Sequence, residues 1–404
     1  MVVAAEHVSY DGFKVYRIRA KTQKQLKLLV ELNKNAHVDL WSPLRSNAHP
    51  TDVMIHPIHE QAYKLTLDLY GIQHEVLIEN VEKMIKNERA LQNQARSLRL
   101  KKKISFTQYN RFDQINAYLD HLARTYRCKV VTKVIGQSYN GRVLKVIQIS
   151  TKPSAKKPII FIDGGIHARE WISPAFVLYV INQLVENAEN RNLLDKVDWH
   201  ILPVMNPDGY EYTHTNDRLW RKTRSPQQNC IGTDPNRNFD YHWGEVGASS
   251  DPCDETYMGP YAFSEIETIN VKTYVETLGS RVKLYLTFHS YGNYLLYPWG
   301  YTSALPSDEP ELRSLARSVN SAIVQAGGDS YTIGTSTNVL YPAAGGSDDW
   351  AKGVARIQLS YTIELPGGGT YGFDPPANKI QPICRETFPG VKVYGKYIAE
   401  KFGN

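Results

Sequence analysis

Short apolar runs alternate with long amphipathic segments from about residue 104 to the end of this 404-residue chain. The apolar runs, which predict strands, are Val143–Thr151, Pro158–Asp163, Val197–Met205, Val282–Phe288 and Ile357–Leu365. The amphipathic segments predict helices at roughly residues 110–125, 173–188, 263–278, 309–326 and 385–401. Buried strands that alternate with helices indicate an α/β fold, in which helices cover both faces of a sheet. A stretch of about 300 residues fits a single domain of this kind.

The first 80 residues follow a different pattern, which predicts the order strand, helix, strand, strand, helix, strand. The strands are expected at Phe13–Ala20, Val38–Pro43, Val53–Pro57 and His74–Ile78, and the helices at residues 22–34 and 58–70. The apolar faces of the two helices are expected to contain Leu26, Leu29 and Val30, and Ala62, Leu65 and Leu69. Gly71 ends the second helix. This order is the split βαβ of the ferredoxin-like architecture. An RNA-binding domain shares it, but the aromatic stacking strand of such a domain is missing.

Residues 81–100 predict a polar helix that connects the two regions and ends in a basic run. The run contains Arg96, Arg99 and Lys101–Lys103. Two interpretations remain open: a solvated linker, or a site of proteolytic processing.

Composition excludes several classes of protein. The formal net charge of +6 is spread along the chain and is not gathered into a nucleic-acid-binding stripe. No apolar run approaches the roughly 20 residues that a membrane helix needs. The four cysteines include no Cys-x-x-Cys pair, so a zinc knuckle is excluded, but they suffice for one or two disulfides. The first residues lack the apolar core of a signal peptide, so the protein is either cytosolic or its signal peptide is absent from this sequence.

A potential metal site arises from residues that follow predicted strands. His167 and Glu170 come after Pro158–Asp163, and Ser173 and Pro174 are expected to cap and open the next helix. Sites of α/β sheets lie at the carboxyl ends of strands. His-x-x-Glu alone occurs often by chance, but His289 ends another predicted strand. Together the three form a His₂Glu set, which recurs in catalytic zinc sites.

Three further segments carry polar residues that are compatible with catalysis or with plain surface loops. Glu364 ends a predicted strand, where a carboxylate beside a zinc site would serve as general base. The segments 218–224 and 234–240 are rich in arginine or acids, and 341–350 is a glycine-containing loop with two acids. Each segment alone is more often a surface charge cluster. His56-x-x-His59 also has metal-like spacing, but it adjoins Pro57 and lacks a nearby third ligand, so we expect no metal there.

Taken together, these segments resemble the zinc metallocarboxypeptidases of the pancreatic A/B type in their zymogen form. The motifs His-Ala-Arg-Glu-Trp, Trp-Arg-Lys-Thr-Arg-Ser, Asp-Pro-Asn-Arg-Asn, Thr-Phe-His-Ser-Tyr and Gly-Gly-Ser-Asp-Asp-Trp occur in the order of that family, and the resemblance covers nearly the whole chain. Val38-Asp39-Leu40-Trp41 is similar to its propeptide signature. The run Glu364-Leu-Pro-Gly-Gly-Gly369 most resembles insect digestive members of the procarboxypeptidase B type.

The resemblance implies a fold, a domain division and a set of roles. It implies a mixed, mostly parallel sheet flanked by helices at residues 104–404, a ferredoxin-like inhibitory prodomain at residues 1–80, and a connecting helix with the activation segment at residues 81–103. It implies one Zn²⁺ per chain, held by His167, Glu170 and His289. The implied catalytic residues are Glu364, as general base, and Arg221, which holds the oxyanion. The implied substrate-binding residues are Arg169, Asn236, Arg237, Tyr291, Tyr341 and Asp348.

The resemblance also bears on specificity. Asp348 matches the pocket-floor position that distinguishes enzymes for basic C-terminal residues from those for apolar ones, and we expect release of Lys and Arg. Ser336 and Thr337 are expected to line the same pocket and are polar, which agrees with this expectation. Gly300, where basic-specific relatives often carry serine, keeps an A-type or broad specificity open. Pro366-Gly367 stands where many relatives have an arginine, so the resemblance does not predict the structure of the pocket rim.

The resemblance implies one disulfide, Cys230–Cys253, and leaves Cys128 and Cys384 either free or joined. It implies a secreted protein of the gut lumen, activated by a trypsin-like protease, acting on peptides with free C-termini as a monomer, without nucleic acid or membrane. Two alternatives are a zinc amidohydrolase of similar fold and a catalytically dead binding protein. The Asn236-Arg237 pair with Tyr341 argues against the first, and the complete set of ligands and base against the second.

Overall fold

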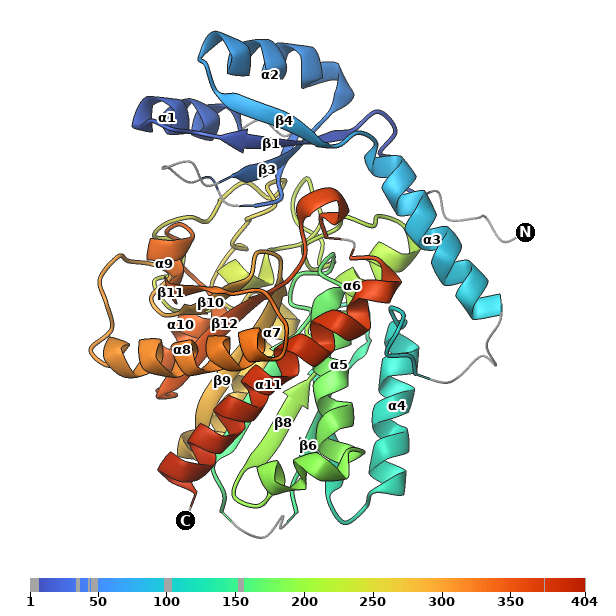
Figure 1. Ribbon diagram of the computed structural model, residues 1–404, viewed down its shortest axis with the longest axis vertical. Helices are drawn as coiled ribbons and strands as arrows, with labels where there is room; N and C mark the ends of the chain where they lie inside the picture. Colours follow the sequence, from blue (N-terminus) through green and yellow to red (C-terminus); the bar gives the residue numbers. More distant parts are fainter. Residues whose placement is uncertain are drawn as a thin grey trace.

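The computed structural model describes residues 7–33, 37–42, 44, 50–97, 104–151, 156–373 and 375–403. Two sheets organise these residues, a small one near the N-terminus and a large one in the rest of the chain (Figure 1). The small sheet and its helices sit on top of the larger unit in the view of Figure 1, and helix α3 runs down beside it.

The N-terminal unit has the predicted split βαβ order. Its elements are β1 (Lys14–Arg19), α1 (Gln23–Leu32), β2 (Val38–Leu40), β3 (Thr51–Ile55), α2 (Pro57–Leu69) and β4 (Gln73–Ile78), and its strands lie in the order β2-β3-β1-β4. All three neighbouring pairs are antiparallel. Thr22 caps α1: its side chain accepts a hydrogen bond from the Gln25 N–H, and the Gln25 side chain accepts one from the Thr22 N–H. Gly71 follows α2 with φ of +60°, as a helix-ending residue should.

The predicted apolar face of α2 was wrong. Leu65 and Leu69 are 62% and 81% exposed, whereas Tyr63 and Leu67 pack in the core of this unit. Val30 on α1 is likewise exposed, while Leu29 is buried. Apolar residues occur on both sides of α2, so helical periodicity alone did not show which side of the helix is buried. The sheet decides, because only one side of the helix can contact it.

Helix α3 (Val81–Ser97) confirms the predicted connecting helix and also contacts the larger unit. Val81 and Ile85 are buried in a cluster that includes Leu219 and Phe373 of that unit. The helix therefore has a partner face, which its polar composition did not reveal. Of the predicted cleavage positions, Arg96 lies in the last turn of this helix, whereas Arg99 and Lys101–Lys103 lie outside the described residues.

The larger unit is a mixed sheet with helices on both faces. Its strands are β5 (Val130–Gln137), β6 (Val143–Ile149), β7 (Ile159–Gly164), β8 (Asp198–Leu202), β9 (Val282–Ser290), β10 (Tyr294–Tyr297), β11 (Thr332–Thr335) and β12 (Leu359–Leu365). They lie in the order β11-β10-β12-β9-β7-β8-β6-β5, with the central strands β12, β9, β7 and β8 parallel. Each predicted strand is confirmed, whereas β5, β10 and β11 were not predicted.

The helices of this unit confirm each predicted helix and add shorter ones. They are α4 (Phe112–Thr125), α5 (Ile172–Val185), α6 (Pro207–Thr215), α7 (Ile266–Leu278), α8 (Glu309–Gln325), α9 (Ser336–Val339), α10 (Ser347–Gly353) and α11 (Ala377–Phe402). Successive residues of a strand point to opposite faces. Accordingly, Ile160 and Ile162 join the core formed with α4, α5, α8 and α11, and Ile159 and Phe161 join that formed with α7 and α10.

Helix α5 begins two residues earlier than predicted, because Ser173 has another role. The helix starts at Ile172, and Ser173 lies inside its first turn. The Ser173 hydroxyl accepts a hydrogen bond from the Gly165 N–H at 3.0 Å and donates one to the Phe288 carbonyl at 2.6 Å. This buried side chain thus links the ends of β7 and β9, which carry the predicted metal ligands.

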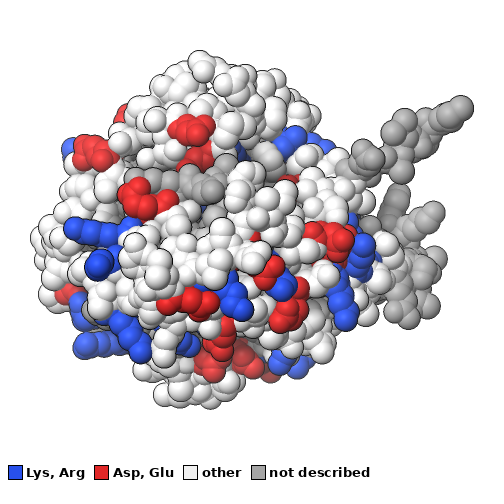
Figure 2. Space-filling model, turned by 90° about the horizontal axis from the view of Figure 1, so that it is seen from above, with Lys and Arg blue, Asp and Glu red and all other residues white. Residues whose placement is uncertain are grey.

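Within the described part of the chain, no helix is both long and apolar enough to cross a membrane. Figure 2 shows acidic and basic side chains intermixed over the face seen from the side of the small sheet.

Candidate active site

The predicted metal ligands meet at the carboxyl ends of β7 and β9. His167 and Glu170 lie in the loop between β7 and α5, and His289 lies near the end of β9. Their ligand atoms all lie within 4.8 Å of one another, and among the described residues this is the one trio of His, Cys, Asp or Glu that meets that distance. All three side chains are buried. The sheet register brings them together, because Gly164 pairs with Phe288 directly before His289.

The arrangement of donor atoms fits zinc. The Nδ1 atoms of His167 and His289 face each other at 3.1 Å, and the Glu170 carboxylate lies 2.8 Å from the first and 3.2 Å from the second. Two imidazole nitrogens and a carboxylate around one point form a donor set that a divalent cation stabilises. On the far side of the ring, His167 Nε2 lies 3.1 Å from the Asp234 carboxylate. A carboxylate there places the proton on Nε2 and leaves Nδ1 free for the metal.

Electrostatics keep the acids of this cluster ionised. Burial alone would raise the pKa of Glu170, but the two imidazoles outweigh burial and lower it. Burial would likewise raise the pKa of Asp234, and Arg221 and His167 hold it well below its ordinary value. Asp234 belongs to the predicted Asp-Pro-Asn-Arg-Asn motif, yet sequence reasoning assigned it no role. The available signal was an acid two residues before Asn236.

Glu364 lies next to His289 on the adjacent strand. It is the sixth residue of β12, and it stands in register with His289 of β9. The side chain is only partly buried, unlike those of the metal ligands. A carboxylate that is beside a metal centre and still partly exposed is placed to exchange a proton with a molecule bound there.

The arginines of the two predicted loops converge on the same centre. Arg221 pairs with Asp234 at 2.8 Å and lies 3.9 Å from the Glu170 carboxylate. Arg237 is buried, and its Nη2 donates to the Tyr341 hydroxyl at 2.9 Å. The structure therefore gathers cationic groups from separate loops beside the metal cluster.

A hydrogen bond and a disulfide fix the loop that carries Asn236. The Asn236 side-chain oxygen accepts from the Ser347 N–H at 2.9 Å, which joins this loop to α10. Cys230 and Cys253 form the predicted disulfide, with a Cα–Cα distance of 5.2 Å. Cys128 and Cys384 are free, the first exposed and the second buried.

The two acids of α10 have different surroundings. Asp349 accepts hydrogen bonds from the backbone N–H groups of Gly300 and Tyr301. Asp348 is buried and accepts from the Ser336 hydroxyl at 3.3 Å. Within the described ranges, Asp348 forms no ion pair with Lys or Arg. Asp349 thus binds backbone N–H groups, whereas Asp348 has no Lys or Arg partner among these residues.

The small N-terminal unit contacts residues that lie beside this cluster. Arg169, a predicted substrate-binding residue, pairs with Asp39 at 2.7 Å, and Glu255 lies 3.7 Å away. The hydroxyl of Tyr291, another such residue, donates to Asp52 at 3.1 Å. Two predicted substrate contacts are therefore taken by acids of the N-terminal unit.

Aromatic packing and two further contacts strengthen this attachment. The rings of Trp41 and Phe373 lie 5.3 Å apart, with Phe373 also in contact with Tyr291. Glu88 of α3 pairs with the fully buried Arg218 at 2.9 Å. The Tyr10 hydroxyl donates to Asp217 at 2.6 Å, which attaches the segment before β1 to the larger unit as well.

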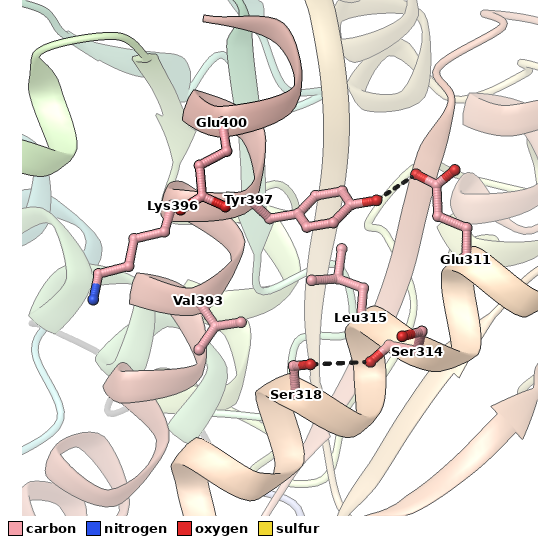
Figure 3. Close-up of a pocket in the computed structure, with 8 residues that line it drawn as sticks. All are labelled: Glu311, Ser314, Leu315, Ser318, Val393, Lys396, Tyr397 and Glu400. Carbon is pink, nitrogen blue, oxygen red and sulfur yellow. Dashed lines mark hydrogen bonds between the residues drawn. The ribbon is translucent and has the colours of Figure 1, made fainter.

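A groove between α8 and α11 lies apart from this site. Figure 3 shows its lining, in which the Tyr397 hydroxyl bonds Glu311 and the Ser318 hydroxyl bonds the Ser314 carbonyl. None of its lining residues belongs to the metal cluster or to the predicted substrate set. The groove adds nothing to the candidate active site.

The fold and the buried His₂Glu cluster together define a zinc-dependent hydrolase with a covering N-terminal unit. Residues 115–390 match the family model for zinc carboxypeptidase, and residues 16–88 match that for carboxypeptidase activation peptide. The chain belongs to the zinc carboxypeptidase family and is a zymogen form of such an enzyme, with zinc as its cofactor.

The similar proteins and structures are named either carboxypeptidase B or carboxypeptidase A. The chain is 48% identical to carboxypeptidase B of Astacus astacus over 303 residues, which are 74% of this chain and 100% of that protein. It is 37% identical to carboxypeptidase B of Helicoverpa zea, over 99% of this chain and 97% of that protein. The crystal structure of carboxypeptidase A from Helicoverpa armigera superposes with a TM-score of 0.91 at 32% identity, and covers 98% of this chain and 99% of that one.

Proposed function

We propose that this zymogen yields a B-type carboxypeptidase, which releases C-terminal Lys and Arg. The observation that carries this proposal is the buried Asp348, whose charge has no Lys or Arg partner within the described residues. A buried carboxylate without a partner is unfavourable, and a cationic side chain of the substrate removes that penalty. The carboxypeptidase B names of the Astacus and Helicoverpa zea relatives support the same specificity.

We propose the following roles for the site residues. His167, Glu170 and His289 hold zinc, which when bound supplies a Lewis acid that activates water. Glu364 accepts the proton of the attacking water and later donates it to the leaving amine. Arg221 donates to the oxygen that gains negative charge, and this interaction strengthens as the charge develops.

The terminal carboxylate of the substrate is held by Asn236, Arg237 and Tyr341. An arginine fork matches a carboxylate and not the neutral amide of an internal bond, which makes the enzyme an exopeptidase. Arg169 and Tyr291 contact residues further from the scissile bond. In the zymogen, acids of the N-terminal unit contact both side chains. We also propose domain bounds of 1–80 for the inhibitory prodomain, 81–103 for the connecting helix with the cleavage segment, and 104–404 for the enzyme.

The specificity is tested by a neutral, nearly isosteric variant of the pocket acid. Asp348→Asn should lower kcat/KM for Arg-ended peptides by 10²- to 10³-fold, because about 3–4 kcal/mol corresponds to a broken buried charge pair. Leu-ended peptides should be spared or improved. The neighbouring variant Asp349→Asn is the matched control, and it should affect both substrates alike because Asp349 binds backbone. An equal loss for both substrates in Asp348→Asn would refute the assignment of Asp348.

A second candidate is A-type or broad specificity. Gly300 supports it, because a glycine leaves no side chain at that wall of the pocket, and the Helicoverpa armigera structure carries the name carboxypeptidase A. Release of Leu or Phe at least as fast as Arg by the activated enzyme would favour this candidate.

We further propose secretion, consistent with the Cys230–Cys253 disulfide, and activation of a monomeric zymogen by a trypsin-like protease within residues 96–103. Activity on C-terminal Arg should appear after trypsin treatment and disappear with a chelator. Mass spectrometry of the products would locate the cleavage.

A further inference from the structure

Arg169 has a second acid close to it, outside the metal cluster and outside the predicted substrate-binding set. Its Nη1 lies 2.7 Å from Asp39 of the N-terminal unit and 3.7 Å from the Oε2 atom of Glu255. Glu255 belongs to the larger unit, so it stays in the enzyme when the prodomain is removed. Two carboxylates therefore share one guanidinium, and only one of them is lost with the prodomain.

The loop that carries Glu255 is fixed on both sides. The Cys230–Cys253 disulfide ends two residues before Glu255. The Tyr257 carbonyl, two residues after it, accepts a hydrogen bond from the Asp234 N–H at 2.8 Å. These anchors all belong to the larger unit. The loop therefore holds Glu255 beside Arg169 whether or not the prodomain is present.

Glu255 and Arg169 both have unused hydrogen-bonding capacity in the latent form. The Oε2 atom of Glu255 and the Nε atom of Arg169 are buried and, among the described residues, have no hydrogen-bond partner. A hydrogen bond between guanidinium and carboxylate spans about 2.7–2.9 Å, so the 3.7 Å between Nη1 and Oε2 is about 1 Å too long. A shift of that size would form the bond once Asp39 no longer occupies Nη1.

We propose that Glu255 takes the place of Asp39 as the partner of Arg169 when the prodomain leaves. In the latent form Glu255 opposes the prodomain, because its carboxylate competes with that of Asp39. In the active enzyme Glu255 is a positioning residue, because it holds the Arg169 guanidinium for the substrate residues that precede the scissile bond. This inference rests on the functions proposed above for Arg169 and for the prodomain.

The charges around Glu255 make this competition depend on pH. Burial, with the charge of Asp39 and against those of Arg169, Arg221 and Lys222, raises the pKa of Glu255 to about 7. Loss of the prodomain removes Asp39 and so lowers this pKa. Binding of the prodomain therefore takes up a proton, and its affinity should fall as the pH rises towards 7 and stay level above.

Other groups of the same contact titrate as well. The Tyr10 hydroxyl donates to Asp217, and burial raises the pKa of each; it also raises the pKa of Glu88, which pairs with Arg218. These groups are present in the wild type and in a Glu255 variant alike. The difference between the two proteins therefore isolates the contribution of Glu255.

The expected effect of Glu255 on prodomain binding is about tenfold. A pKa of 4.5 in the free enzyme and about 7 in the latent form would change the affinity by about 300-fold. However, the side chain of Glu255 is 40% exposed, so solvent screens its repulsion of Asp39 and reduces this factor.

Sedimentation of the trypsin-nicked zymogen over a dilution series measures prodomain binding without using enzymatic activity. At pH 8, Glu255→Gln should lower the dissociation constant about tenfold, and this difference should shrink at pH 5.5. Glu276→Gln, a change of an exposed acid on α7, is the matched control and should equal the wild type at both values. Equal sedimentation coefficients of the uncleaved proteins verify that the variants are folded.

A double-mutant cycle tests whether Glu255 acts through Asp39. In the Asp39→Asn background, Glu255→Gln should lower the dissociation constant by a smaller factor than in the wild-type background, because the competing charge is already gone. Equal factors in the two backgrounds would overturn the competition. A dissociation constant that Glu255→Gln leaves unchanged or raises would overturn it too.

Kinetics of the activated enzyme test the positioning role. For a peptide with three or more residues before the terminal Arg, Glu255→Gln should raise KM about threefold or more with little change in kcat. A substrate with a single residue before Arg does not extend to Arg169, so its KM should change less. Equal KM values of wild type and variant on the longer peptide would refute this role. If the activated wild type released no C-terminal residue, the proposed function would fail, whereas the dissociation constants would still decide whether Glu255 opposes the prodomain.

Discussion

Replacement of Asp39 by Asn should make the intact zymogen partly active. In the structure, the Asp39 carboxylate lies 2.7 Å and 3.4 Å from the two terminal nitrogens of Arg169, and it also accepts from the Trp41 indole at 3.1 Å. Arg169 is buried, and Asp39 is 18% exposed. The substitution removes the charge of Asp39 but keeps its shape, so it weakens this contact without disturbing the fold of the prodomain.

The magnitude follows from what Arg169 retains. A hydrogen bond to a charged group contributes about 1.5–3 kcal/mol. Glu255 at 3.7 Å and the Phe373 ring at 4.4 Å still stabilise the guanidinium, so a loss near the lower part of that range is expected. A loss of about 2 kcal/mol corresponds to a roughly 30-fold larger open fraction. Basal hydrolysis by uncleaved Asp39→Asn zymogen should rise by that factor.

The assay measures initial rates on a short acylated peptide ending in Arg, with a serine-protease inhibitor present to prevent cleavage. Asp68→Asn is the matched control, because Asp68 lies on the same unit with a side chain that is 56% exposed. After complete cleavage and removal of the prodomain, all variants should show equal kcat/KM, since neither residue remains in the enzyme. A basal rate for Asp39→Asn equal to that of the wild type would refute the role of this ion pair in latency.

Three further outcomes are expected. Burial raises the pKa of Glu267 from 4.5 to about 7, so the folded state favours the protonated carboxyl. Ionisation of Glu267 therefore lowers the free energy of unfolding by up to about 3 kcal/mol above pH 7 and has no effect below pH 4.5. Glu267→Gln should raise Tm at about pH 8 but not at about pH 4. Loss of the disulfide in Cys230→Ser/Cys253→Ser should lower the free energy of unfolding by roughly 3 kcal/mol in denaturant titrations, and an unchanged midpoint would contradict this. Glu364→Gln should reduce kcat at least about 10³-fold while atomic absorption still finds one zinc, whereas loss of zinc would make Glu364 a structural residue.

The catalytic cluster could be predicted because its residues follow strong signals. His167 and His289 each come after an apolar run, and parallel strands bring the ends of such runs to one edge of a sheet. The structure confirms that His167, Glu170 and His289 meet, and that Glu364 stands beside them. Local pattern and chain order were sufficient there, because the sheet itself provides the long-range contact.

Other features depended on contacts that no local pattern encodes. Strands β10 and β11 have four residues each, too few to show alternation. The buried face of α2 was predicted wrongly because both sides of that helix carry apolar residues. The role of Ser173 depends on Gly165 and Phe288, one of which is far away in the chain.

The attachment of Tyr10 to Asp217 has a kinetic consequence. Cleavage within residues 96–103 would cut the covalent link but leave this hydrogen bond and the pairs Asp39–Arg169 and Glu88–Arg218 in place. Before the cut, the N-terminal unit is held at a high effective concentration by its tether; afterwards, its retention depends on the concentrations of the two separate pieces. Appearance of activity should therefore lag behind cleavage, more so in concentrated solution, and dilution alone should shorten the lag.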